Sequence, residues 1–401
     1  KASERTLLAV VALAGGFTLL QFPALGPLAV VFAALCIDYS FGTGTAVALN
    51  PATLLVPVAL ALWLARELAL GRFRLAPSRI NRPLFLWLLA GLLSLGLGIV
   101  LWDLAVPRPD NILIVQVGQW GLFAVASGAL LLTANTIRTE ATLRHLVYFF
   151  LAVAGFIVVG RYVPGLGAFI FRYVTFAYHR APFWMVLTAL ALGQLLYNPR
   201  VTLAGRIGLL AILAAVLGYS LFDKQESAST WIGIAAVVVM LVWFRYRRLR
   251  WILITIVVVA LITGVLTDAL WNFAGGDDEW TTSGGSRLAL IERVIQVTLR
   301  NPITGLGPAA YRSYAGVQPL SYRRALWTAP AVNSHNNYVD LFAHTGLLGL
   351  GLFFWLMIEL GALAFRLRCL VRSGFMSGFV HAMLAAWVGA LALMMMADWI
   401  L

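Results

Sequence analysis

The sequence predicts an all-α polytopic membrane protein. Of its 401 residues, 61% are hydrophobic and only 11% are charged, and the mean hydropathy is +0.89. A soluble domain carries roughly 25% charged residues. Many segments also reach the ~20 apolar residues that are needed to cross the hydrocarbon core of a bilayer. We therefore expect a single integral membrane domain over residues 1–401, with about 11 or 12 transmembrane helices and one large extracytoplasmic loop that contains an amphipathic helix.

The apolar segments follow one another along the chain with short polar connections. Gln21 and Pro23 separate the first two, which are short, so these two form either a helical hairpin or one broken span. In chain order, the segments lie near 6–20, 22–36, 47–65, 83–102, 112–133, 146–160, 181–197, 207–221, 230–244, 251–270, 337–365 and 378–397.

The distribution of arginine predicts how these spans are oriented. Cytoplasmic loops of membrane proteins carry an excess of lysine and arginine. Sixteen arginines and only two acidic residues lie in the loops 66–82, 134–145, 198–206, 245–250 and 366–372. We therefore expect these loops to be cytoplasmic. The most basic of them, RYRRLR at 245–250, is typical of a segment that anchors a membrane protein at lipid headgroups.

The opposite face should be poor in arginine, yet it holds nine besides Arg108. Guanidinium groups bind phosphate oxygens in pairs and stay charged when they are removed from water. We therefore expect a few of these residues to bind an anion. The nine are Arg161, Arg172, Arg180, Arg287, Arg293, Arg300, Arg312, Arg323 and Arg324.

The large extracytoplasmic loop is predicted over residues 271–335. An acidic, glycine-rich linker opens it, and the periodicity of 286–300 then predicts an amphipathic helix that ends before Asn301-Pro302. Its predicted apolar face consists of Leu288, Ile291, Val294 and Ile295, and its wet face of Glu292, Arg293, Gln296 and Arg300. Arg287 falls in the middle of the apolar face. It is either a structural ion-pairing residue or an anion-binding residue, because an unpaired buried charge costs several kcal/mol.

The stretch NSHNNYVDLFAHTGLLGLGLF, 333–353, gathers polar residues at the mouth of an apolar span. If a helix begins near His335, then Gly346 and Gly349 share its face and permit a neighbouring helix to approach closely. His335 would lie at the rim, where imidazole suits a general base or a proton shuttle. The alternative is an ordinary interfacial hydrogen-bonding residue. His344 lies deeper and fits a structural hydrogen-bonding role better.

Four motifs resemble those of the O-antigen ligases and the related lipid-linked glycan polymerases and protein oligosaccharyltransferases. His335-Asn336, nine residues, Gly346, two residues and Gly349 are similar to the signature that closes the family's outer loop. Within RNPITGLGPAAYR, 300–312, lies a turn similar to the family's Pro-x-x-Gly-x-Gly. Ser286-Arg287 and Arg172, which precedes YVTF, resemble two arginines that the family has on this face. The resemblance is strong over about 280–360 and elsewhere mainly topological.

The sequence departs from the family at one place. The family usually has Ser-Arg before the span that begins near residue 230, whereas this chain has DKQESASTW and no arginine. Lys224 could substitute as a point charge. Otherwise one phosphate ligand is missing, and a non-catalytic accessory or structural subunit on the same scaffold becomes the alternative reading.

The resemblance implies a metal-independent membrane glycosyltransferase of the bacterial cytoplasmic (inner) membrane, without a cofactor. Its donor would be a glycan on undecaprenyl pyrophosphate, and its acceptor a hydroxyl of a lipid or glycan. His335 would be the catalytic base or orienting group. Ligation, polymerisation and protein glycosylation share the motif. The expected substrate-binding residues are Arg172, Arg180, Arg287, Lys224, Asn336 and Asp340.

Two other classes of protein were considered, a lipid transporter and an accessory subunit. A transporter or flippase for an anionic lipid would need charges or broken helices at the membrane midplane, and charges within the spans are almost absent. No nucleotide-binding loop or acidic metal site is present in the sequence, so a cytoplasmic nucleotide-sugar transferase is not favoured. No nucleic-acid partner is expected, because the positive-inside bias accounts for the basic charge. An accessory subunit would instead belong to a larger membrane complex.

Overall fold

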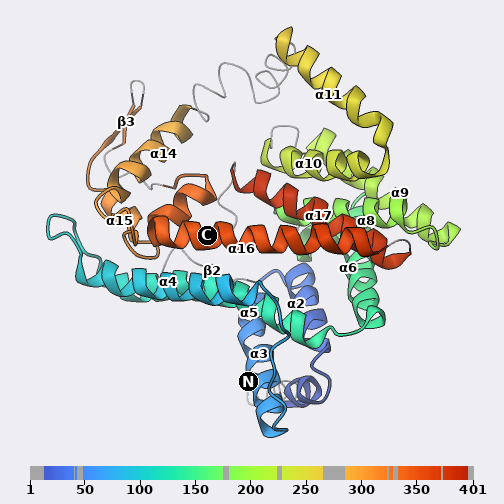
Figure 1. Ribbon diagram of the computed structural model, residues 1–401, viewed down its shortest axis with the longest axis horizontal. Helices are drawn as coiled ribbons and strands as arrows, with labels where there is room; N and C mark the ends of the chain where they lie inside the picture. Colours follow the sequence, from blue (N-terminus) through green and yellow to red (C-terminus); the bar gives the residue numbers. More distant parts are fainter. Residues whose placement is uncertain are drawn as a thin grey trace. The chain divides into compact units, whose positions relative to one another are not determined.

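The computed structural model describes residues 13–39, 41–42, 48–174, 180–223, 228–264, 285–322, 325–327, 333–371 and 374–395. Helices dominate these residues (Figure 1), and the protein is an all-α polytopic membrane protein, as predicted. Two short antiparallel pairs accompany the helices. They are β1 (Phe41–Gly42) with β2 (Ala48–Leu49), and β3 (Leu320–Tyr322) with β4 (Ala325–Trp327).

Seven of the described helical segments are long and apolar enough to cross a bilayer. They are α3 (Pro51–Ala69), α4 (Asn81–Val100), α5 (Ile112–Thr136), α6 (Glu140–Gly160), Leu203–Phe222, which joins α9 (Leu203–Gly218) to the π-turn η2 (Tyr219–Asp223), α16 (Asn337–Leu370) and α17 (Phe375–Met394).

Shorter helices cover the other predicted segments. They are residues 13–21, α2 (Leu25–Cys36), α8 (Ala181–Tyr197), α10 (Ala228–Arg245) and α11 (Arg247–Ile262). Each predicted apolar segment therefore overlaps a described helix. The number of complete crossings stays a prediction.

The chain divides into two compact units. The first comprises 1–81 and 121–179, and the second comprises 82–120 and 180–401.

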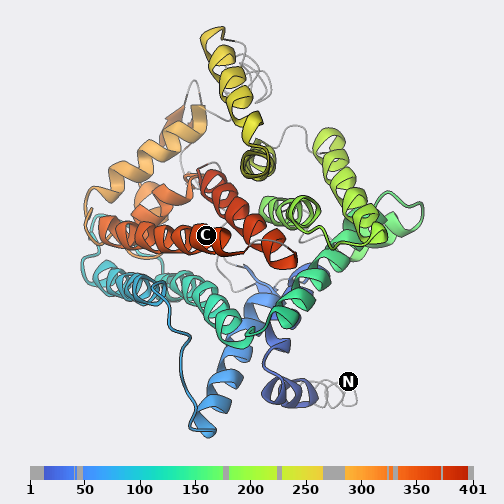
Figure 2. The ribbon, with the colours of Figure 1, turned by 45° about the vertical axis from the view of Figure 1, so that its right-hand side comes forward.

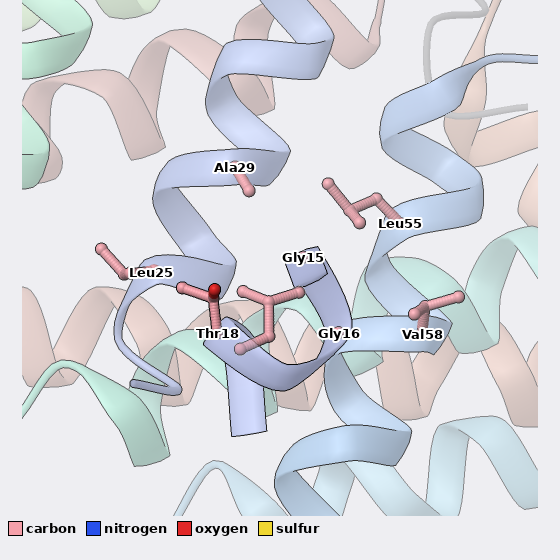
Figure 3. Close-up of a pocket in the computed structure, with 8 residues that line it drawn as sticks. Gly15, Gly16, Thr18, Leu25, Ala29, Leu55 and Val58 are labelled. Carbon is pink, nitrogen blue, oxygen red and sulfur yellow. The ribbon is translucent and has the colours of Figure 1, made fainter. Parts of the chain in front are cut away.

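In the first unit, the side chain of Asn50 caps α3 by accepting a hydrogen bond of 2.8 Å from the Thr53 backbone amide. Ala59, Trp63 and Leu132 form a buried cluster. A cavity of about 510 Å³ lies between residues 13–21, α2 and α3, and almost all of its lining is apolar (Figure 3).

The second unit has its tightest packing among α8, α10 and α17, which lie side by side (Figure 2). Gly193 of α8 allows this approach, because a Cβ there would lie only 2.7 Å from the Gly378 carbonyl oxygen and from the Cβ of Ala382. The buried amide of Gln194 donates to the Phe375 carbonyl at 3.1 Å. Small residues and satisfied polar groups at helix crossings are typical of membrane bundles.

The predicted amphipathic helix is α14 (Gly285–Thr298), which ends before Asn301-Pro302 as expected. Its buried stripe differs from the predicted one: Leu290, Val294 and Val297 are buried, whereas Leu288 and Ile295 are 60% and 36% exposed. The three buried residues pack into a core with α15 (Tyr311–Ala315) and the start of α16. The prediction was therefore wrong for Leu288 and Ile295, because the apolar arc of α14 is wider than its contact surface.

Candidate active site at the start of helix α16

Helix α16 is broken at Gly346. The backbone there has φ 66° and ψ −169°, a combination that side-chain-bearing residues rarely adopt. The break leaves backbone amides on one side and carbonyls on the other without their helical hydrogen-bond partners, and the turn 302–307 supplies these partners. The amides of Leu347 and Leu348 donate to the carbonyls of Pro302 and Ile303 at 2.9 and 3.0 Å. In the other direction, the Leu306 amide donates to the carbonyl of Ala343 at 2.9 Å.

Glycine is required on both sides of this contact. A Cβ on Gly346 would lie 2.2 Å from the Ile303 carbonyl oxygen, and one on Gly305 would lie 2.6 Å from the Gly346 amide nitrogen. The expectation that Gly346 admits a neighbouring helix was therefore wrong, because its neighbour is the backbone of the turn. A Cβ on Gly349 would collide with the Thr345 side chain of its own helix.

His344 joins the same turn to α16. Its Nδ1 accepts a 2.8 Å hydrogen bond from the amide of Ala309, whose φ of 57° places it in the left-handed region. The hydroxyl of Ser94 in α4 donates to the His344 carbonyl at 2.6 Å. His344 is completely buried. These contacts fit the structural role that was favoured for this histidine.

The helix begins two residues later than expected. Asn336 is the N-cap: its side-chain oxygen accepts hydrogen bonds from the amides of Tyr338 and Val339 at 3.0 and 3.2 Å. The side-chain nitrogen of Asn336 donates to the carbonyl of Met395 at 3.1 Å. His335 therefore precedes the helix and does not share a helical face with Gly346 and Gly349, so that part of the prediction was wrong.

His335 is half-buried and has a φ of 52°. A left-handed backbone at a residue other than glycine costs of order 1–3 kcal/mol and commonly marks a functional position. Ser334 holds the neighbouring backbone. Its hydroxyl lies 2.7 Å from Oδ1 of Asp340, to which it can donate, and it accepts a 3.0 Å hydrogen bond from the Asn336 amide.

Asp340 is buried beneath this strained turn, close to Tyr311 of α15. Burial raises the pKa of the Tyr311 phenol, and the Asp340 carboxylate raises it further, whereas Arg312 acts in the opposite direction. Tyr311 therefore stays protonated at neutral pH and can donate a hydrogen bond to Asp340. The guanidinium of Arg312 lies 5.8 Å from the centre of the Tyr311 ring. Ser334 and Asp340 thus hold the backbone on both sides of His335, and Tyr311 lies close to this carboxylate.

Residues 224–354 match the family model described as O-antigen ligase. This part of the chain is similar to the O-antigen ligases. A comparison with curated proteins finds no match to this chain. The matched segment contains α14, the turn 302–307, the strained His335 and the break at Gly346. Hydrogen bonds join the turn to α16, and apolar packing joins α14 to α15 and to the start of α16.

Two arginines of the O-antigen ligase-like segment hold its outer loop together. Arg293 donates to the carbonyls of Ala315, Gln318 and Pro319 at 3.3, 2.9 and 3.1 Å. Arg300 forms an ion pair with Asp103, and its guanidinium lies 5.7 Å from the centre of the Tyr314 ring. Both lie on the wet face of α14 or just beyond it, as expected. Their partners assign them structural roles.

The other predicted anion ligands are less constrained. Arg287 is half-buried and lies three residues before Leu290, so it belongs to the buried stripe of α14 as expected. Arg172 is exposed near the end of α7 (Leu166–Tyr173), in the first unit, and Arg180 is exposed at the N-cap of α8, in the second. Lys224, Arg323 and Arg324 lie outside the described residues. A phosphate-binding role for these residues stays a prediction.

Sequence reasoning missed Gln116 and Gln119 of α5. Both are completely buried, and neither carboxamide has a hydrogen bond to a described residue. The Gln116 side-chain nitrogen would lie 3.1 Å from a Cβ on Gly307, so it rests against the turn of the O-antigen ligase-like segment. The sequence did contain a signal for these two glutamines, because polar residues inside an apolar span are energetically costly and usually functional. Ser334 and Tyr311 gave no comparable signal.

Proposed function

We propose that this O-antigen ligase-like protein transfers a glycan from undecaprenyl pyrophosphate to an acceptor hydroxyl, at the outer face of the bacterial cytoplasmic membrane. The acceptor oxygen attacks the anomeric carbon of the donor sugar, and the bond from that carbon to the pyrophosphate oxygen breaks. His335 accepts or orients the acceptor proton, and undecaprenyl pyrophosphate leaves. The acceptor is a lipid or glycan hydroxyl.

The observation that carries this proposal is the backbone of His335. A residue that costs 1–3 kcal/mol in this conformation is held there by a capped helix and a buried carboxylate. A histidine fixed this way can meet an acceptor hydroxyl with little further loss of conformational freedom. The residue is half-buried, which is compatible with access of substrate to it.

Asn336 and Asp340 support His335 in this proposal. The contacts of Asn336 cap the helix, and Asp340 is completely buried, so both act by positioning the strained turn. Direct contact of either residue with the donor remains a prediction from the family resemblance.

The donor pyrophosphate would meet Arg287, with Arg172, Arg180 and Lys224 as further ligands. Negative charge grows on the leaving pyrophosphate in the transition state, so fixed guanidinium groups accelerate the reaction there. Arg287 is the best supported of the four, because a half-buried guanidinium on an apolar stripe requires an anionic partner.

The test is in vitro transfer from a defined undecaprenyl-pyrophosphate glycan, comparing wild type with His335→Gly, His335→Ala and His335→Asn. Glycine adopts the left-handed conformation without cost, and asparagine adopts it more readily than alanine does. Removal of a general base typically costs 10²- to 10⁴-fold in rate. We therefore expect all three variants to lose transfer, and His335→Gly to be at least as stable as wild type.

A purely structural role of His335 predicts a different ranking of the three variants in transfer and stability. His335→Gly would then retain transfer, His335→Ala would be the least stable, and donor binding would follow stability. Activity in the glycine variant would therefore refute the assignment of His335, and thermal unfolding of the three variants reports the backbone contribution separately.

A non-catalytic accessory subunit is the second candidate, and the missing Ser-Arg before residue 230 favours it. Wild-type protein that binds the donor but transfers no glycan, across a panel of acceptors, would support it. A transporter gains little from the broken helix, because the turn 302–303 already satisfies the amides that follow the break at Gly346. In a transporter those amides would face the substrate.

A further inference from the structure

Three arginines lie around one aromatic stretch near the end of α16, whereas the candidate active site lies at the start of this helix. The stretch is Trp243-Phe244-Arg245-Tyr246, where α10 ends and α11 begins. The Arg250 guanidinium lies 5.7 Å from the centre of the Trp243 ring, and its Nε donates to the Trp243 carbonyl at 2.6 Å. The Arg245 guanidinium lies 5.8 Å from the centre of the Tyr246 ring.

The third arginine reaches the stretch from another helix. Arg368, near the end of α16, lies between two rings, with its guanidinium carbon 4.3 Å from the centre of Phe244 and 4.4 Å from that of Phe365. The contact with Phe244 therefore brings Arg368 to the same stretch that Arg245 and Arg250 contact, although Arg368 belongs to α16 and the other two to α10 and α11.

These positive charges have no carboxylate partner among the described residues. No acidic oxygen there lies within 4.0 Å of Arg245, Arg250 or Arg368, whereas Arg366, two residues away, reaches Glu359. A guanidinium that stacks on an aromatic ring keeps its in-plane N–H groups available for an anion. Three such groups, fixed by rings and by one backbone carbonyl, form a preorganised anion site.

We propose that Arg245, Arg250 and Arg368 bind the phosphate group of an anionic membrane phospholipid. The surrounding surface favours a lipid over a soluble phosphate. Apolar side chains flank the cluster and are exposed, with Leu249 38%, Trp251 73%, Leu367 37% and Leu370 74% accessible. Such a surface lies beside acyl chains, where the headgroup phosphate would meet the guanidiniums. The site lies in the loops predicted to be cytoplasmic, where anionic lipids attract basic segments.

The test uses the purified full chain in detergent, after removal of bound lipid. Binding is measured by native mass spectrometry with phosphatidylglycerol, with phosphatidylcholine and with inorganic phosphate alone. We expect tight binding of phosphatidylglycerol, weaker binding of phosphatidylcholine and none of free phosphate. Binding of inorganic phosphate as tight as that of phosphatidylglycerol would overturn the lipid assignment and indicate a soluble ligand.

A matched pair of variants separates a built site from general surface charge. Arg250→Gln/Arg368→Gln removes two ring-seated arginines. Arg247→Gln/Arg248→Gln removes two exposed arginines of the same segment. Loss of an arginine that contacts the phosphate directly costs about fivefold in affinity or more, whereas an exposed arginine outside the site has no such contact to lose. We expect the first pair to lose about 25-fold or more and the second only a few-fold, and equal losses would refute the proposal.

A charge-preserving variant covers the case in which the first pair fails to fold. Arg250→Lys/Arg368→Lys keeps both charges but loses the planar fork. We expect it to bind phosphatidylglycerol at least tenfold more weakly than wild type. Full affinity in the lysine variant would show that charge alone suffices, and would contradict an arginine site of defined geometry.

Discussion

Replacement of Gly346 by alanine tests the junction between α16 and the turn 302–307. The new Cβ would lie 2.2 Å from the Ile303 carbonyl oxygen and 2.5 Å from the Gly305 amide nitrogen. Both neighbours are backbone atoms, so no side chain can rotate away. The turn must move, or α16 must change its path.

The expected cost follows from two contributions. Alanine at φ 66°, ψ −169° carries a backbone penalty of about 1–3 kcal/mol. Displacement of the turn weakens the hydrogen bonds from Leu347 and Leu348, each of which contributes about 0.5–1.5 kcal/mol. The free energy of unfolding should therefore fall by about 2–6 kcal/mol, a large fraction of the 5–15 kcal/mol typical of folded proteins.

The measurement is thermal unfolding of the detergent-solubilised protein, with Gly351→Ala as the matched control. Gly351 lies in the same helix, and a Cβ there would meet nothing within 4 Å. Alanine at Gly351 should raise the stability by about 0.5–1 kcal/mol, because alanine is the better helix former. Equal unfolding midpoints for Gly346→Ala and wild type would refute the backbone argument.

A double-mutant cycle with Gly305→Ala sharpens the same test. A Cβ on either glycine strikes the backbone of the other, so both substitutions push the same two segments apart. In the double variant, the free energy of the contact between the two segments is therefore lost only once. We expect its destabilisation to be smaller than the sum of the single effects by about 0.5–3 kcal/mol, the range found for residues in contact. Strict additivity would show that the two glycines are independent.

Three further predictions concern the same region and the topology. His344→Ala should lower the free energy of unfolding by about 1–3 kcal/mol, because the Ala309 amide loses its acceptor in a buried place, and thermal unfolding measures this. Arg287→Lys should weaken donor binding, measured with a labelled lipid-pyrophosphate glycan, because an ammonium lacks the bidentate fork; unchanged affinity would remove Arg287 from the donor site. In intact cells, a membrane-impermeant thiol reagent should label a cysteine placed at Val317, which is exposed, and spare one placed at Arg247; the reverse pattern would invert the predicted orientation.

Most of the fold could be predicted because the length of an apolar segment is a local signal. Every predicted apolar segment overlaps a described helix, and Asn301-Pro302 ends α14 where expected. The start of α16 was placed two residues early, although asparagine is a preferred N-cap and Asn336 could have been recognised as one. The contact stripe of α14 could not be chosen correctly, because its apolar residues span about half of the helix circumference and only part of that arc meets α15 and α16.

The break in α16 was not predictable from its own residues. Apolar sequence continues on both sides of Gly346, and the groups that satisfy the free amides come from Pro302 and Ile303, more than 40 residues earlier. A glycine that shares a helix with other glycines reads as a helix-packing residue. Its actual role depends on a long-range pairing of two backbone segments, which periodicity does not encode.

That pairing explains why the two glycine motifs occur together in one chain. Gly305 and Gly346 are needed because two backbones touch, His344 is needed to accept the Ala309 amide, and Asn336 is needed to begin the helix. None of these requirements calls for histidine at position 335. The left-handed backbone at this position would cost less conformational free energy with glycine. This chain instead has an imidazole, the side chain that exchanges a proton most readily near neutral pH. The structural demands of the motif therefore account for these other residues, and a catalytic role for the His335 side chain stays a prediction that the transfer assay tests.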